Sequence, residues 1–112
     1  MESKKLVESI CNFLSEKKAY DIVKIYVADK TVVADYFVIA SGRSQTQVKS
    51  LCENVEEFIE KQGGTIKSVE GASEGRWAVV DAVDVLVHIF NDEQRLFYHL
   101  ERLWGDGEKY QD

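Results

Sequence analysis

Residues 76–90 read Arg76-Trp-Ala-Val-Val-Asp-Ala-Val-Asp-Val-Leu-Val-His-Ile-Phe90 and predict the centre of the fold. Two apolar runs rich in Val, Ile, Phe and Trp meet there at a short corner, and neither run contains Gly or Pro to interrupt a strand. The pattern predicts a β-hairpin. With a two-residue loop at Ala82-Val83, the register would place Trp77 opposite His88, Val79 opposite Leu86, and Asp81 opposite Asp84.

Side chains alternate between the two faces of such a hairpin. One face would carry small or β-branched groups that suit packing under helices, namely Ala78, Val80, Val85, Val87 and Ile89. The other would carry Trp77, Val79, Leu86, His88 and Phe90. The loop is atypical, because a two-residue turn favours Gly, Asn or Asp, and a β-branched Val tolerates positive φ poorly. A longer loop would shift the register, and we expect that shift to break this sorting of the faces.

The remaining pattern predicts helices packed on a sheet. The expected elements are, in order, a helix over 4–18, strands over 21–28 and 32–41, a helix over 44–62, a strand over 65–69, the hairpin, and a helix over 91–104. Ser44 and Gln47 form a capping box, Asn91 can cap the last helix, and the polar tail 105–112 should fray. The nearly unbroken apolar run 35–40 suits a central strand. The fold class is therefore α/β (α+β), with a mixed sheet of about five strands and three helices.

Length and composition indicate one globular domain over residues 1–112. The chain has 112 residues, of which 45% are hydrophobic and 30% charged. No apolar run approaches the roughly 20 residues that span a bilayer, and the N-terminus lacks the apolar stretch of a signal peptide, so we expect no membrane partner and a cytoplasmic location. Cys11 and Cys52 lack the spacing of a metal or redox motif, and we interpret them as buried reduced thiols.

The formal net charge of −6 bears on the class of partner. Affinity for nucleic acids comes largely from Lys and Arg that neutralise phosphates, and this chain has no basic run longer than a lysine pair. An acidic domain is attracted instead to basic protein surfaces. We therefore expect a basic protein partner and no nucleic acid as the main contact.

Three groups of residues are candidate sites of chemistry. The loop Ser41–Ser44 before a helix could cradle a phosphate, but it lacks the glycines and lysine of a P-loop, and a turn with a helix cap explains it. Asp81 and Asp84 could bind Mg²⁺, yet their spacing fits a solvated acidic corner. His88 and His99 have no Cys or His at metal spacing, and His88 in a strand is more typical of a packed, hydrogen-bonded histidine than of a catalyst. The sequence thus predicts no catalytic residue, metal or cofactor.

Trp77 has two interpretations. As a core residue it would need a partner for its indole N–H, and as an exposed anchor it would offer the large area that makes Trp frequent in binding hot spots. The predicted register places Val79 and Leu86 beside it, with Asp81 and Asp84 as an acidic rim. We therefore predict a partner-binding surface made of these five residues.

Five ordered blocks extend over nearly the whole chain, from Leu6 to Trp104. They are Asp35-Tyr-Phe-Val-Ile-Ala-Ser-Gly42 with Ser44, Glu70-Gly71, Trp77-Ala-Val-Val-Asp81, Asp84-Val-Leu-Val-His-Ile-Phe90 and Arg95-Leu-Phe-Tyr-His-Leu-Glu-Arg-Leu-Trp104. Together they resemble the ribosomal silencing factor family, also called the Iojap-related family. The resemblance implies a nucleotidyltransferase-like domain that represses translation by binding large-subunit protein fourteen on the large ribosomal subunit and blocking the small subunit. It also implies homodimers.

Carried over residue by residue, the exposed Trp of that family matches Trp77, and its binding positions fall near Val79, Asp81 and Asp84. Many members have Gly just before the aspartate that matches Asp84, where this chain has Val83. The alternative function is a nucleotidyltransferase-like metal-dependent enzyme that uses the Ser41–Ser44 loop. The chain lacks the Asp-x-Asp metal pair of such enzymes after a Gly-Ser loop, so the resemblance to them would be one of fold alone.

Overall fold

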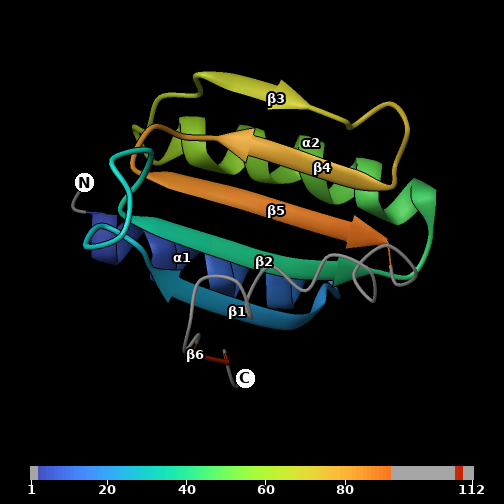
Figure 1. Ribbon diagram of the computed structural model, residues 1–112. Helices are drawn as coiled ribbons and strands as arrows, with labels where there is room; N and C mark the ends of the chain where they lie inside the picture. Colours follow the sequence, from blue (N-terminus) through green and yellow to red (C-terminus); the bar gives the residue numbers. More distant parts are fainter. Residues whose placement is uncertain (1–2, 92–107, 110–112) are drawn as a thin grey trace.

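A mixed β-sheet with the strand order β3-β4-β5-β2-β1-β6 forms the centre of the protein in the computed structural model, which describes residues 3–91 and 108–109 (Figure 1). Both helices of the described residues lie on one face of this sheet (Figure 1). The elements are, in order, α1 (Ser3–Glu16), β1 (Tyr20–Tyr26), β2 (Tyr36–Gly42), α2 (Gln45–Lys61), β3 (Ser68–Glu70), β4 (Trp77–Asp81), β5 (Val85–Asn91) and β6 (Glu108–Lys109).

The strand β2 is central, as its apolar run predicts. It pairs in parallel with β5 and antiparallel with β1, whereas the other neighbouring strands pair antiparallel. All residues of β2 after Tyr36 are buried. The predicted mixed sheet is therefore confirmed, and the run 35–40 is apolar because both of its faces are covered.

The end of the chain differs from the prediction. The third predicted helix, 91–104, lies outside the described residues except for Asn91, which is the last residue of β5. Within the tail 105–112, the expectation of fraying was wrong for residues 108–109, because they form β6 and pair with Val23 and Lys24 of β1. Backbone pairing with an edge strand needs no apolar side chain, so a polar sequence does not reveal it.

The helix α2 begins and ends as the sequence predicts. The backbone N–H of Gln47 donates to the Ser44 Oγ at 3.0 Å, and the Gln47 Oε1 accepts from the Arg43 N–H at 2.6 Å. Gln47 thus reaches one residue beyond the N-cap, a variant of the capping box. At the other end Gly63 takes φ +87°, and the Gly64 N–H donates to the Ile59 carbonyl at 2.9 Å, which satisfies a terminal helix carbonyl.

The larger hydrophobic core lies between the helices and the sheet. The apolar stripes of α1 and α2 pack on the small and β-branched residues of β4 and β5, and the rings of Phe13 and Phe58 stack at 4.3 Å between the two helices. Cys11 and Cys52 are buried and free, as predicted. Burial raises the pKa of the Cys11 thiol to about 12 and that of Cys52 to about 11.

The register of the β4–β5 hairpin corrects the sequence prediction. The observed pairs are Trp77 with Phe90, Ala78 with Ile89, Val79 with His88, Val80 with Val87, and Asp81 with Leu86. The shift is two residues, because the corner is longer than the predicted Ala82-Val83 loop. Since side chains alternate with a period of two, this shift keeps every residue on its predicted face, and our expectation that a longer loop would break the sorting was wrong.

Candidate functional site

The corner between β4 and β5 is held by its own polar groups. Val83 adopts φ +72°, and its N–H donates to the Asp81 Oδ1 at 2.9 Å. The Ala82 N–H donates to the Val85 carbonyl, also at 2.9 Å. The strain of a β-branched residue with positive φ is thus offset by an aspartate that bonds the backbone two residues ahead.

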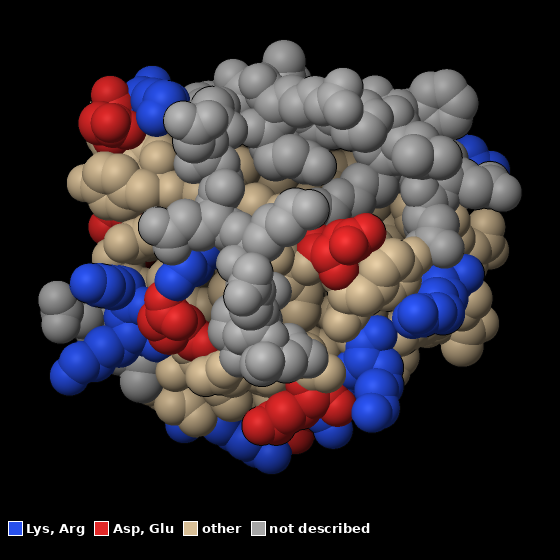
Figure 2. Space-filling model, turned by 90° about the horizontal axis from the view of Figure 1, so that it is seen from below, with Lys and Arg blue, Asp and Glu red and all other residues tan. Residues whose placement is uncertain are grey.

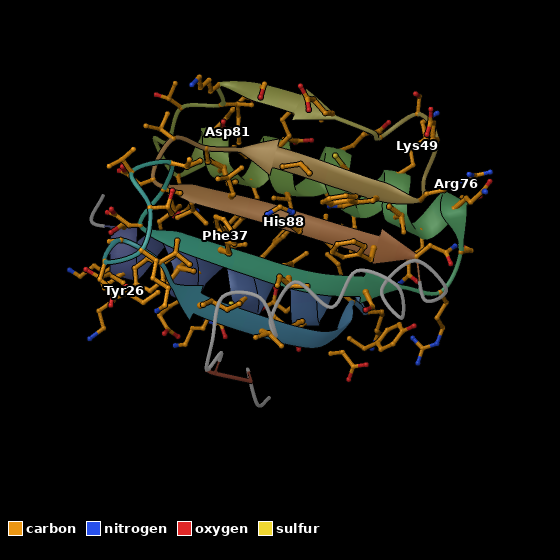
Figure 3. The ribbon with its side chains drawn as sticks, viewed as in Figure 1. Tyr26, Phe37, Lys49, Arg76, Asp81 and His88 are labelled. Carbon is orange, nitrogen blue, oxygen red and sulfur yellow. The ribbon has the colours of Figure 1, made fainter. Side chains whose placement is uncertain are left out.

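A second segment packs against this corner. The loop of residues 27–35 joins β1 to β2, and the N–H groups of Asp35 and Tyr36 donate to the Asp84 carbonyl at 2.8 and 3.1 Å. The corner therefore belongs to a larger end of the sheet, built from two loops that are about 50 residues apart in sequence. Tyr26 and Asp81 lie at this end, and Arg76 and Lys49 lie at the opposite end (Figure 3).

Trp77 combines both of its interpretations. Its side chain is half-buried, and its ring stacks on the ring of Phe90 at 5.1 Å between centroids. Its indole Nε1–H donates to the Nδ1 of His88 at 3.2 Å. Trp77 therefore has the hydrogen-bond partner that a core residue needs, and it lies on the sheet face opposite the helices.

His88 is buried beside Trp77, with an exposed fraction of 8%. Phe37 of β2 contacts it edge-on at 5.1 Å between ring centroids, and both side chains lie over the middle of the sheet (Figure 3). Because its Nδ1 accepts from Trp77, the neutral imidazole carries its proton on Nε2, and this atom is buried without a hydrogen-bond partner in the part of the chain that the structure describes. Burial lowers the pKa of His88 to about 4. The prediction of a packed, hydrogen-bonded histidine is confirmed, whereas His99 lies outside the described residues.

The structure places the other four predicted partner-binding residues on the same hairpin. Val79 is half-buried and packs on the same hydrophobic cluster as Trp77, whereas Leu86 belongs to that cluster and is 9% exposed. The observed register places Leu86 opposite Asp81 and not, as predicted, opposite Val79. Asp84 is exposed at the corner, and Asp81 is half-buried with its carboxylate bonded to the corner backbone. Trp77 begins β4 and Asp81 ends it, so the five residues extend along the hairpin from the start of β4 to the corner, and we refer to them as the β4–β5 surface.

The proposed sites of chemistry have structural roles among the described residues. The Ser44 Oγ caps α2, and the guanidinium of Arg43 lies over the Tyr20 ring at 4.5 Å. Residues 3–91 contain no group of three His, Cys, Asp or Glu side chains placed to hold a metal ion. Among the same residues, neither helix has the length and apolar character needed to cross a bilayer.

Comparison with known proteins decides the family. The family model described as "Ribosomal silencing factor during starvation" matches residues 1–112. The chain belongs to the ribosomal silencing factor family. It is similar to the ribosomal silencing factor of Halalkalibacterium halodurans, with 35% identity over 95% of this chain and 91% of that protein. The Bacillus subtilis factor is 36% identical over 95% of this chain and 90% of that protein.

The fold agrees with this membership. A crystal structure of a Chromobacterium violaceum protein superposes with a TM-score of 0.91 at 32% identity, and the match covers 99% of this chain and 92% of that chain. The resemblance stated from the sequence is therefore confirmed, as is the α+β fold class with a mixed sheet.

Sequence reasoning missed the contribution of loop 27–35 to the site of this silencing factor family member. The prediction treated Val32 and Val33 as the start of a strand, whereas both lie in the loop and are exposed, with exposed fractions of 103% and 60%. The available signal was the pair of adjacent valines between the polar turn residues Asp29-Lys30-Thr31 and Asp35. Two adjacent valines are equally typical of a strand that is buried on both faces, so the sequence does not distinguish an exposed loop from the start of a strand.

Proposed function

We propose that this protein represses translation by binding the large ribosomal subunit and sterically blocking its association with the small subunit. The observation that carries the proposal is membership of the ribosomal silencing factor family over the full length of the chain. In this proposal the direct partner is large-subunit protein fourteen. The protein acts by occlusion and not as an enzyme, so it needs no cofactor.

The β4–β5 surface is the proposed contact. The half-buried Trp77 supplies apolar area from a rigid position, because its ring is stacked on Phe90 and its N–H is bonded to His88. A fixed ring loses little conformational entropy on binding, which is the property of a hot-spot aromatic. Leu86 belongs to the same apolar cluster, and Asp84 adds an exposed negative charge at the corner end of the surface.

The charge supports a basic protein as the partner rather than RNA. The net charge is −6, and on the face seen in Figure 2 the described acidic and basic side chains are interspersed. Electrostatic attraction between an acidic rim and a basic protein mainly speeds association, whereas a desolvated apolar anchor mainly slows dissociation. Rising salt should therefore lower the association rate, because the Debye length falls from about 10 Å at 0.1 M to about 3 Å at 1 M.

Subunit association provides the first test. Purified large and small subunits are mixed with increasing amounts of the protein and separated by sedimentation. The proposal expects fewer joined subunits and comigration of the protein with large subunits. Undiminished joining at saturating protein would contradict it.

Binding kinetics on immobilised large subunits provide the second test. Trp77→Ala should weaken binding by about 2 kcal/mol or more if Trp77 is a hot spot. The pair Asp81→Asn with Asp84→Asn should lower the association rate and its salt dependence, and Asn at position 81 keeps an oxygen that can accept from the Val83 N–H. Glu53→Gln, an exposed charge on α2, is the matched control and should leave the rate unchanged. Equal rates for the aspartate pair and for this control would exclude steering by the corner.

Assembly and location are further parts of the proposal. The protein is expected to act in the cytoplasm and to form homodimers, as the family resemblance implies. Sedimentation velocity over a range of concentrations measures the dimer directly, and a purely monomeric protein at high concentration would contradict this part alone.

A further inference from the structure

The exposed large hydrophobic side chains of the described residues gather at one end of the sheet. They are Tyr26, Val32, Val33 and Val83, with exposed fractions of 54%, 103%, 60% and 48%. Tyr26 ends β1, the two valines lie in loop 27–35, and Val83 lies in the β4–β5 corner. Exposed apolar residues scattered singly are ordinary, but a cluster confined to one end indicates a binding surface. We call these four residues the apolar end.

The two loops that carry the apolar end form one structure. The Asp35 N–H donates to the Asp84 carbonyl at 2.8 Å and ties the first loop to the corner. The Tyr26 ring contacts the ring of Tyr36 edge-on at 5.3 Å, at the point where β1 and β2 leave the sheet. The apolar end is therefore continuous with the corner of the β4–β5 surface.

Loop 27–35 presents its valines from an ordered turn. The Val27 N–H donates to the Asp35 carbonyl at 2.8 Å, and the Thr31 N–H donates to the Val27 carbonyl at 3.0 Å. The Val33 N–H donates to the Thr31 Oγ1 at 3.2 Å. Val27 and Ala34 are buried at the base of the loop, with exposed fractions of 0% and 6%, so the core of the protein does not need the two exposed valines.

The charge around the apolar end determines which occupant fits it. Residues 27–35 and 81–84 contain four aspartates and one lysine, a formal charge of −3. A second copy docked end to end would bring two such charges together, and RNA would bring phosphates to the same aspartates, so both are repelled. A protein surface with an apolar centre and a rim of Lys or Arg is attracted.

We propose that the apolar end is the second half of the ribosome-docking surface and that it binds an apolar, basic-rimmed patch of a large-subunit protein. The inference rests on the proposed function for the identity of the partner. It adds that Val32 and Val33, which the β4–β5 surface does not include, become buried in the complex. Their burial is expected to contribute at least about tenfold to affinity.

The first experiment replaces both valines. Val32→Ser with Val33→Ser should weaken equilibrium binding to purified large subunits by at least about tenfold and leave the urea midpoint unchanged, because both side chains are exposed. Thr46→Ser is the matched control, an exposed β-branched residue in the first turn of α2 at the opposite end of the sheet. Wild-type affinity in the double variant would overturn the inference, while binding by the wild type would leave the proposed function standing. If the wild-type protein does not bind large subunits, the proposed function is wrong, and a large-subunit protein is then also excluded as the partner of the apolar end.

The second experiment identifies the occupant directly. A photo-crosslinking amino acid, p-benzoylphenylalanine, is placed at position 32 and irradiated in complex with purified large subunits. The expected product joins the protein to a large-subunit protein, and mass spectrometry locates the cross-link beside Lys or Arg. A product that joins it mainly to ribosomal RNA or to a second copy of itself would overturn the inference.

Discussion

Acidification should destabilise the protein through His88 well before the carboxylates titrate fully. In the folded state burial lowers the pKa of His88 from 6.5 to about 4. As the pH falls, His88 therefore becomes protonated near pH 6.5 in the unfolded chain but only near pH 4 in the folded protein. Between these values the unfolded state holds more protons, so stability falls as the pH falls, and above pH 6.5 His88 contributes no pH dependence.

The magnitude follows from the two pKa values. At about pH 5 the unfolded histidine is almost wholly protonated and the folded one almost wholly neutral, which gives a ratio of about 30, or about 2 kcal/mol, relative to pH 7.5. Protonation would also remove the Nδ1 lone pair that accepts from the Trp77 Nε1–H. The loss is therefore large compared with the few kcal/mol by which small domains are stable.

Urea unfolding followed by circular dichroism at about pH 7.5 and about pH 5 measures this loss. The control is His88→Gln, which does not titrate but keeps a side-chain oxygen that can accept from Trp77. All carboxylates are common to both proteins, so the difference between their pH dependences isolates His88. An identical loss of stability in both proteins would contradict this prediction, because it would mean that the folded histidine titrates normally.

Two further predictions test the packing. Gly71→Ala should lower the free energy of unfolding by about 2–4 kcal/mol, because φ is +78° and an added Cβ would lie 2.1 Å from the Trp77 carbonyl oxygen. Gly63 has φ +87° and no atom within 4 Å of an added Cβ, so Gly63→Ala should lower it by only about 1 kcal/mol. Urea unfolding measures both values. Equal costs would show that loop 71–76 can move away from β4. The thiols of Cys11 and Cys52 should resist Ellman's reagent at pH 8 until the protein unfolds, since burial raises both pKa values and excludes the reagent, and rapid labelling of the native protein would contradict this burial.

The sorting of the hairpin faces shows what local sequence determines. Alternation with a period of two assigned Ala78 and Val80 to the helix side and Trp77 and Val79 to the other side. The predicted register of β4 against β5 nevertheless differs from the observed one by two residues, because the register depends on the length of the corner. The corner is held by a bond from the Val83 N–H to the Asp81 carboxylate, which is local, and by bonds from Asp35 and Tyr36 to the Asp84 carbonyl, which no local pattern predicts.

The candidate site divides in the same way. The apolar stripes of the helices, the cap at Ser44, the central place of β2 and the family could all be predicted from the sequence, because each depends on neighbouring residues or on ordered blocks of residues. The hydrogen bond from Trp77 to His88, the pairing of β6 with β1, and the joining of loop 27–35 to the corner could not be predicted in this way and are seen only in the folded protein. These features are contacts between different strands or loops, and their energies depend on burial and on hydrogen-bond geometry that arise only when the sheet has formed.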